Sequence, residues 1–303
     1  MSLQVVVLGS LNMDLTIRVP RLPQPGETIT GHSFSKIPGG KGANQAAALA
    51  KLGAHVRIIG RVGQDSFGVS LVDSLTDAGV DTSLVALTDG VSSGLAFIFV
   101  DDAGENVIVL ERGANGLLTP GDASAAKESI QKAGALLLQL EVPLETVIQA
   151  AQVAKSAGVQ VILNAAPAEL IPDLLLELVD VLIVNETELF VVSGSDRSLR
   201  EATQALLARG VESVLVTLGR KGSMLVTNQG TTQMPAFEVE AVDSTAAGDA
   251  FTAAYVLALL EGFDSRSCLR FASAAAAIKV TRRGAQPGLA SRLEVEDFLA
   301  AND

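Results

Sequence analysis

Seven residues in the last quarter of the chain have the types and the spacing needed for chemistry on a phosphoryl group. Asp243 and Asp249 enclose five small residues, and the apolar run 251–260 predicts a helix that begins at this turn. The N–H groups that begin a helix lack partners within it and lie at the positive end of its dipole, so an anion can bind there. Asp249 is suited to accept the proton of an attacking hydroxyl group beside that anion. The alternative is that Asp249 only caps the helix.

The segment 38–44, Pro-Gly-Gly-Lys-Gly-Ala-Asn, leads into another predicted helix. It is not a P-loop, which needs Ser or Thr after the lysine, and it does not fit the dinucleotide-binding fingerprint. Consecutive glycines let a ligand approach the backbone closely, and Lys41 and Asn44 offer hydrogen-bond donors. An ordinary glycine-rich loop before a helix is the alternative, and the spacing alone does not separate the two.

Polar residues directly follow several predicted strands, at the ends where ligands bind in α/β sheets. Their carboxylate and amide groups are candidates for binding sugar hydroxyls or a hydrated magnesium ion. Turn formation by Asn and Asp, and the frequent use of acids in first helical turns, are the alternatives. The residues are Asn12 and Asp14 after the first strand, Glu141 after the strand 135–140, and Asn185 with Glu188 after the strand 181–184.

A further strand ends in the loop 217–222, which contains two glycines and two cations. Arg220 and Lys221 offer positive charge to a ligand, although solvated surface charge is the commoner use of such residues. All of these segments lie at the carboxyl ends of strands, so the sequence predicts that they meet at one rim of the sheet.

The composition narrows the chemistry further. The chain has 303 residues, 48% of them apolar, and a mean hydropathy of +0.38, which is enough for a large α/β core. Its two histidines, His32 and His55, and its single cysteine, Cys268, argue against serine–histidine triads and zinc clusters, so acid–base work is assigned to carboxylates. A net charge of −12 argues against a nucleic-acid partner. Without a long apolar run or a basic leader segment, we expect no membrane partner and a cytoplasmic protein.

The alternation of elements predicts a doubly wound α/β domain with a mostly parallel sheet and helices on both faces. A small antiparallel β appendage is expected from two separated segments, about 15–37 and 93–112, and the whole chain 1–303 is expected to form one domain. Strands are predicted near 5–8, 55–59, 135–140, 159–163, 181–184 and 214–217, with edge strands near 223–227 and 231–236. Helices are predicted near 42–52, 67–78, 122–132, 144–157, 170–178 and 198–209, and three more start near 247, 264 and 293.

In these residues the chain resembles the PfkB-type carbohydrate kinases. Gly-Gly-Lys-Gly-Ala-Asn-Gln at 39–45 and the run 243–249 resemble the two signatures of that family, and this pair is characteristic of its ribokinase branch. The similarity extends in order over essentially the whole chain, through Asn12 and Asp14, Gln139 and Glu141, and the segments 185–188, 217–219 and 281–287.

The resemblance implies ATP-dependent phosphorylation of D-ribose at its primary 5-hydroxyl. Deoxyribose, fructose or a nucleoside is the alternative acceptor. The low aromatic content of 4%, without tryptophan, argues against a nucleoside kinase, which needs a ring to stack on the base. The implied cofactors are ATP, Mg²⁺ and K⁺. The appendage would be a lid that excludes water from the reaction, and interlocking lids would make the protein a homodimer.

The resemblance also implies a role for each matching position. Asp249 would be the catalytic base, and the N–H groups of Ala246, Ala247 and Gly248 would form the anion hole. With Asp249, the sugar would be held by Asn12, Asp14, Gly40, Lys41, Asn44 and Glu141. The nucleotide would be bound by Asn185, Thr217, Gly219, Gly222, Gly248 and Ser273, with magnesium bound through water by Glu188. Potassium would be bound by Asp243 and by backbone carbonyls of Thr245, Lys279, Arg282, Gly284 and Gly288.

Two positions depart from the family pattern. Ala246 stands where the family usually has glycine. Alanine keeps the backbone donor, so the anion hole is retained on the condition that φ at this residue is negative. Ala165 stands where a proline is common after Asn164, which loosens that turn. Neither change touches a catalytic side chain.

Overall fold

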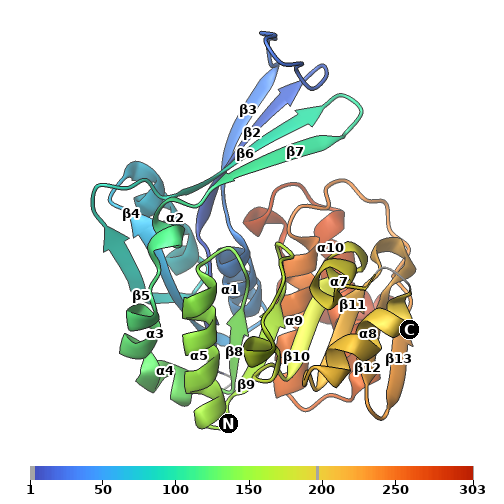
Figure 1. Cartoon of the computed structure of the whole chain (residues 1–303). Helices are drawn as coiled ribbons and strands as arrows, with labels where there is room; N and C mark the ends of the chain where they lie inside the picture. Colours follow the sequence, from blue (N-terminus) through green and yellow to red (C-terminus); the bar gives the residue numbers. More distant parts are fainter. Residues whose placement is uncertain (1–3, 196–197, 303) are drawn as a thin grey trace.

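The main body of the protein is a single nine-stranded sheet covered by helices on both faces (Figure 1). The computed structural model describes residues 4–195 and 198–302. Seven neighbouring strands are parallel, in the order β11-β10-β9-β8-β1-β4-β5, and β12 and β13 extend one edge in antiparallel fashion. The strands of this sheet are β1 (Gln4–Leu8), β4 (His55–Gly63), β5 (Asp81–Thr88), β8 (Ala135–Leu138), β9 (Gln160–Asn164), β10 (Val181–Asn185), β11 (Ser213–Thr217), β12 (Ser223–Thr227) and β13 (Gly230–Met234).

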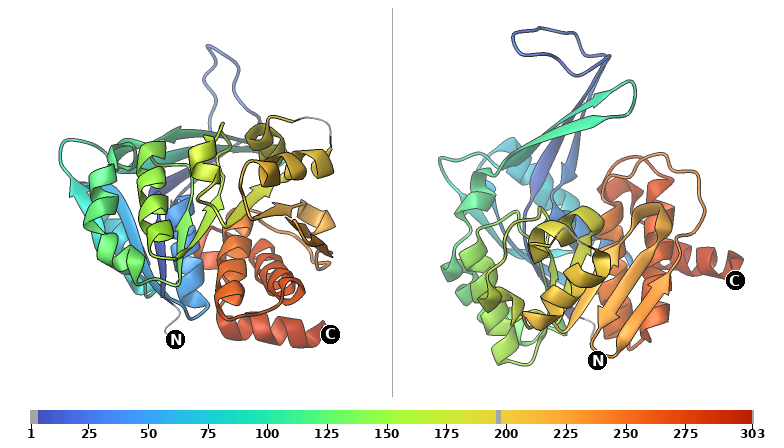
Figure 2. Two further views of the ribbon diagram at one scale, coloured as in Figure 1. Left: turned by 60° about the horizontal axis from the view of Figure 1, so that its bottom comes forward. Right: turned by 45° about the vertical axis from the view of Figure 1, so that its right-hand side comes forward.

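Successive side chains of a strand point to opposite faces, so a strand that is buried throughout serves two cores. In β1, Val5 and Val7 belong to one apolar cluster, whereas Val6 and Leu8 belong to the other. The first cluster is covered by α1 (Lys41–Lys51), α2 (Ser66–Asp77), α9 (Ala247–Leu260), α10 (Ser265–Val280) and α11 (Arg292–Ala301). The second is covered by α3 (Pro120–Ala125), α4 (Lys127–Gln131), α5 (Leu144–Ser156), α6 (Asp173–Leu176), α7 (Glu186–Ser193) and α8 (Leu199–Ala208), on the opposite side of the sheet (Figure 2).

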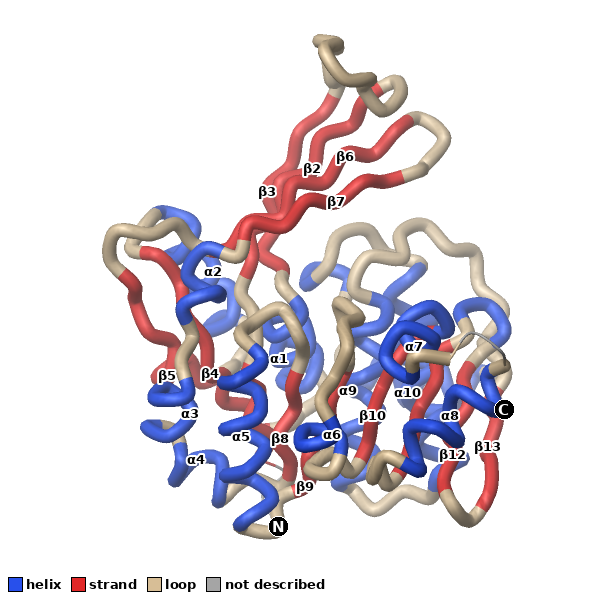
Figure 3. Tube along the Cα trace, viewed as in Figure 1, coloured by secondary structure: helices blue, strands red, loops and turns tan. Residues whose placement is uncertain are grey.

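A second sheet of four strands projects from the body, beyond the carboxyl ends of the parallel strands (Figures 1 and 3). Its order is β3-β2-β6-β7, with two antiparallel pairs joined by a parallel contact between β2 and β6. The strands are β2 (Asn12–Val19), β3 (Ser33–Gly39), β6 (Gly94–Asp101) and β7 (Asn106–Glu111). Because β2 starts four residues after β1 ends, it carries Asn12 and Asp14 directly from the rim of the main sheet into the projecting one.

The predicted fold class is confirmed, and three elements differ from expectation. The edge strand β5 was not predicted, because its residues are mostly half-buried and do not alternate cleanly between apolar and polar. The helix expected at 122–132 is divided into α3 and α4 at Ala126. The helix expected at 170–178 is only α6, because Pro172 disfavours helical geometry in the residue before it. Among the described residues, no helix is long and apolar enough to cross a membrane.

Candidate active site

Asp249 lies in the first turn of α9 and is almost completely buried, with 7% of its surface exposed. Asn44 donates a hydrogen bond from Nδ2 to Oδ2 of Asp249 at 3.0 Å, and Gln45 donates from Nε2 to Oδ1 at 2.9 Å. Both donors come from the start of α1, which packs against α9. Neutral amide donors fix the orientation of a carboxylate without supplying a counter-charge, so Asp249 is held in place with its capacity to accept a proton intact.

A chain of buried amides supports this carboxylate from behind. Gln45 also donates to Oδ1 of Asn164 at 2.9 Å, and its own Oε1 accepts a hydrogen bond from Nε2 of Gln139 at 2.6 Å. Asn164 in turn donates to the backbone oxygen of Ile183 at 3.2 Å. The sequence analysis assigned no role to Gln45, Gln139 or Asn164. The sign that could have pointed to Gln139 and Asn164 is a polar residue at the end of an otherwise apolar strand, and Gln139 is also among the positions that carry the family resemblance.

The turn before α9 has the open helix terminus that the sequence predicts, with one correction. The φ angle at Ala246 is +59°, so the expectation of a negative φ at this alanine is wrong. No side chain caps the helix, and a Cβ atom added to Gly248 would meet nothing within 4 Å, which shows that this backbone faces open space. The N–H of Ala247 donates to the backbone oxygen of Ser244 at 3.1 Å, so a bound phosphoryl oxygen would compete with that contact.

Glu141 is the centre of a polar cluster at the ends of β1 and β8. Its Oε2 accepts hydrogen bonds from Nδ2 of Asn12 at 3.1 Å, from the backbone N–H of Lys41 at 3.2 Å, and from Oγ of Ser10. Asn12 is held from its other side by Asn115, which donates from Nδ2 to Oδ1 of Asn12 at 2.7 Å. Ser10 and Asn115 were missed by the sequence analysis, because neither lies in a recognisable motif.

Charges of both signs converge on this cluster. Burial, together with the neighbouring carboxylates of Glu141 and Asp249, raises the pKa of Asp14 to about 7. Burial alone would lower the pKa of Lys41, but the carboxylates of Asp249, Glu141 and Glu188 outweigh it, so that pKa lies above its ordinary value. One ammonium group therefore stands among several carboxylates, an arrangement suited to a neutral ligand with many hydroxyl groups.

The glycines of the segment 39–42 allow these groups to come close together. Gly40 has a φ of +90°, and a Cβ atom there would lie 2.6 Å from the backbone nitrogen of Asn12. A Cβ atom on Gly42 would lie 2.6 Å from the backbone carbon of Gly9. The first turn of α1 can therefore approach the end of β1 only because these positions have no side chain.

Two cavities meet at the start of α9. The smaller has a volume of about 150 Å³ and the larger about 920 Å³. Thr217 and Gly248 line both, so the two cavities adjoin at the predicted anion hole. The smaller cavity is also lined by Lys41, Asn164, Asn185, Glu188, Ala246 and Asp249.

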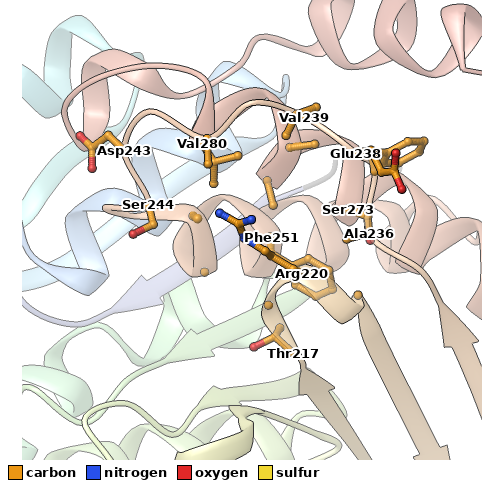
Figure 4. Close-up of a pocket in the computed structure, with 18 of the residues that line it drawn as sticks. Thr217, Arg220, Ala236, Glu238, Val239, Asp243, Ser244, Phe251, Ser273 and Val280 are labelled. Atoms are coloured by element: carbon orange, nitrogen blue, oxygen red, sulfur yellow. The ribbon is translucent and has the colours of Figure 1, made fainter. Parts of the chain in front are cut away.

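The larger cavity is a cleft with mostly small or apolar walls, and Figure 4 shows Phe251, Val239 and Val280 around it. Such a surface suits a flat, weakly polar ring. Of the predicted nucleotide-binding residues, Thr217, Gly219, Gly222, Gly248 and Ser273 line this cleft, and Asn185 lies instead in the wall of the smaller cavity. Arg220, which the sequence analysis favoured as surface charge, is exposed and also lines the cleft.

Glu188 and Asn185 form a capping box at the start of α7. The backbone N–H of Asn185 donates to Oε2 of Glu188, and the backbone N–H of Glu188 donates to Oδ1 of Asn185, both at 2.8 Å. Burial raises the pKa of Glu188. Within the described ranges, no group of three or more His, Cys, Asp or Glu side chains is placed to hold a metal alone. Because magnesium keeps most of its waters and is bound largely by substrate phosphates, a single carboxylate at the cavity fits it.

The residues predicted to bind potassium are brought together, but a lysine side chain lies among them. Lys279 is completely buried, and its Nζ donates to the backbone oxygens of Asp243 and Arg282, both at 3.1 Å. The carboxylate of Asp243 accepts from the N–H groups of Thr245 at 2.9 Å and Gly284 at 2.8 Å. An ammonium group in contact with these oxygens repels a second cation, so the residues present do not fit a potassium ion here.

The two side chains of this cluster have opposite pKa shifts. Burial would raise the pKa of Asp243, but its hydrogen bonds from Thr245 and Gly284 and the charge of Lys279 lower it below its ordinary value. Burial lowers the pKa of Lys279, and the Asp243 carboxylate opposes that shift. Asp243 is thus an acid held in its ionised form by backbone N–H groups and a nearby ammonium group.

Comparisons with known proteins agree with this geometry. Residues 2–292 match the protein family described as "pfkB family carbohydrate kinase". It is 42% identical over 300 residues to the ribokinase of Haemophilus influenzae, covering 97% of this chain and 98% of that protein. It is 35% identical over 306 residues to the deoxyribokinase of Salmonella typhi, covering 99% of this chain and all of that protein.

Among solved structures, the fold is similar to that of Arabidopsis thaliana ribokinase complexed with ribose and ATP. The TM-score is 0.91 at 37% identity, and the match covers 99% of each chain. The resemblance found in the sequence is thereby confirmed, and the chain belongs to the pfkB family of carbohydrate kinases.

Proposed function

We propose that this protein catalyses the ATP-dependent phosphorylation of D-ribose at its 5-hydroxyl group, giving ribose 5-phosphate and ADP. The observation that carries this proposal is the position of Asp249. It is buried, oriented by two neutral amides, and lines the small polar cavity at the point where that cavity adjoins the large apolar cleft. A sugar in the first cavity and a nucleotide in the second would bring an acceptor hydroxyl and a terminal phosphate together beside this base.

In the proposed reaction, Asp249 accepts the proton of the 5-hydroxyl as the sugar oxygen bonds to the γ-phosphorus of ATP. The bond from that phosphorus to the bridging oxygen of ADP breaks, and the electron pair leaves with ADP. The open backbone around Gly248 stabilises the charge on the transferring group. A magnesium ion, when bound to the phosphates with Glu188 as a water-mediated ligand, neutralises part of their charge.

The sugar site is proposed to consist of Asp14, Lys41, Glu141 and Asn12, of which Lys41 also lines the small cavity. These groups already contact each other or perturb each other's pKa values in the ligand-free protein. The projecting sheet carries Asp14 on β2, so we propose that it acts as a lid whose movement brings this carboxylate to the sugar and excludes water.

Ribose and 2-deoxyribose are the acceptors that need to be distinguished, because a deoxyribokinase is among the similar proteins. A cavity with several carboxylates and an ammonium group favours the sugar that offers more hydroxyls. The test is to measure kcat/KM for ribose, 2-deoxyribose, fructose and adenosine with ATP under the same conditions. We expect ribose to have the highest value, and a ribose value no higher than that of 2-deoxyribose contradicts the assignment.

The projecting sheet also supports a proposed homodimer. Cross-strand partners share a face, and the register of β2, β3, β6 and β7 places Phe34, Phe97, Val107 and Val109 on the face opposite to Asp14. Their exposed fractions are 62%, 39%, 44% and 55%. An apolar surface of this kind on a projecting sheet is suited to a second copy of the same sheet.

Sedimentation of the wild type and of Val109→Glu tests this dimer. We expect the wild type to sediment as a dimer and the variant as a monomer, whereas Ile108→Glu, on the face shared with Asp14, keeps the dimer. A monomeric wild type contradicts the proposal. The proposed compartment is the cytoplasm, where ATP is available, and potassium is left out of the proposed function because of the position of Lys279.

A further inference from the structure

Among the described residues, Lys279 has the largest fully buried side chain, and the proposed reaction does not use its charge. It belongs to the last turn of α10 and extends toward two segments, the turn that begins at Asp243 and the loop around Arg282. Its hydrogen bond to Asp243 falls three residues before Ala246, where the anion hole begins. The buried ammonium group of Lys279 therefore connects the turn that precedes the proposed anion hole to a loop about forty residues away in sequence.

The surrounding chain is shaped to accept this side chain. A Cβ atom added to Gly288 would lie 2.9 Å from both Cδ and Cε of Lys279 and 3.3 Å from its Nζ. Gly288 does not need a positive φ, so the close approach of the lysine stem is the reason that no side chain fits there. Gly288 thus leaves the space that the Lys279 side chain occupies, and two backbone oxygens hold its ammonium group in a defined position.

We propose that the Lys279 ammonium group acts as a built-in cation, which holds the 243–247 turn against the 282–288 loop and makes the enzyme independent of added monovalent cations. Two carbonyl oxygens and a nearby ionised carboxylate are the kind of surroundings that a monovalent cation needs. A tethered ammonium group supplies the same unit charge without the entropy cost of capturing an ion. The inference rests on the proposed function, and Lys279 is a positioning residue in it.

The matched control is Lys51, whose ammonium group contacts the same loop from the last residue of α1. Its Nζ donates to the backbone oxygens of Gln286 at 2.9 Å and Leu289 at 3.5 Å. Lys51 therefore braces the loop but does not contact the Asp243 turn. Substitution of Lys51 removes a comparable pair of hydrogen bonds and leaves the proposed built-in cation in place.

The experiment compares initial rates in potassium, sodium and tetramethylammonium chloride at equal ionic strength, for the wild type, Lys279→Ala, Lys279→Met and Lys51→Ala. We expect the wild type to have equal rates, within twofold, in all three salts. Lys279→Ala should lose roughly tenfold or more of its kcat in tetramethylammonium and regain most of it in potassium, because the removed side chain leaves room for the ion. Lys279→Met should lose kcat without rescue, since its side chain fills that room without charge. Lys51→Ala should show no salt-specific rescue.

Activation of the wild type by potassium of more than about threefold overturns the proposal, and so does a Lys279→Ala variant without potassium-specific rescue. A second readout does not depend on turnover. Potassium should raise the melting temperature of Lys279→Ala, but not that of the wild type, over tetramethylammonium. If the wild type proves inactive with ribose, the proposed function fails while this thermal comparison still decides the role of Lys279.

The pairing with Gly288 gives a further check that depends neither on turnover nor on the Lys279→Ala variant. Gly288→Ala should lower the melting temperature of the wild type by several degrees, because the added methyl group overlaps the lysine stem. In a Lys279→Met background, whose flexible side chain lacks the fixed hydrogen bonds of Nζ, the decrease should be clearly smaller. Equal decreases in the two backgrounds show that the lysine is not anchored in that place and overturn the proposal.

Discussion

The small cavity and the large cleft are lined by different kinds of residues. Around the small cavity and in the Glu141 cluster, which Lys41 connects to it, side chains make the contacts, and Asn12, Glu141 and Asp249 are each fixed by hydrogen bonds to other side chains. Around the large cleft, glycines, alanines and valines predominate. The first region is suited to select a ligand by its hydroxyl pattern, and the second by its shape.

Asp249→Asn should have the largest effect, because it removes the base at the junction of the two regions. We expect kcat to fall by about 10²- to 10⁴-fold, the range that general-base catalysis supplies. The KM values for ribose and ATP should change only a few-fold, since the substituted amide still fills the same buried position. Steady-state kinetics with both substrates varied checks this, and near-normal turnover would show that Asp249 is not the base.

Asp14→Asn should act on the proposed sugar site alone. Losing a charged hydrogen bond to a ligand costs about 1.5–3 kcal/mol, so the KM for ribose should rise roughly 10- to 100-fold. The KM for ATP should remain within twofold of the wild-type value. Equal increases in both KM values would mean that the two regions are not separate in function.

Arg220→Ala should act on the cleft alone and more weakly. Arg220 is exposed beside the cleft, and screened charges at such positions contribute little, about 0–1 kcal/mol. We expect the KM for ATP to rise up to about fivefold with an unchanged KM for ribose. An effect on ribose larger than that on ATP would contradict the placement of the nucleotide in the larger cleft.

The buried carboxyl group of Asp14 should also make stability depend on pH. Asp14 has a pKa of about 7 in the folded protein against an ordinary value of 3.8, so the folded state binds a proton more tightly than the unfolded state. Its contribution to stability is therefore greatest below pH 4 and is lost as the pH rises to about 7. Asp14→Asn should melt a few degrees higher than the wild type at pH 8 and not at pH 4. In Arg220→Ala, any difference from the wild type should be the same at both pH values.

The sequence predicted the parallel body, the projecting strands and the acids at strand ends, because each of these depends on local patterns. It did not predict the groups that hold the acids in place. Ser10 and Glu141 are 131 positions apart, and Asn12 and Asn115 are 103 apart, so their contacts follow from the assembled sheet rather than from spacing. Lys279 was counted only for its backbone carbonyl, because nothing local indicates that its side chain turns inward.

Ala246 combines a strained backbone with a place in the wall of the small cavity, next to the proposed anion hole. An alanine at φ +59° costs roughly 1–2 kcal/mol more than a glycine in the folded protein. Alanine also has fewer conformations than glycine in the unfolded chain, which raises the free energy of unfolding by about 0.4–1 kcal/mol. The second effect offsets the first only in part, so the stiffer turn has a net cost in stability of about 0–1.6 kcal/mol. In the proposed reaction, the N–H groups of this turn would then meet the phosphate already aligned, and their ordering would be completed during folding rather than in each catalytic cycle.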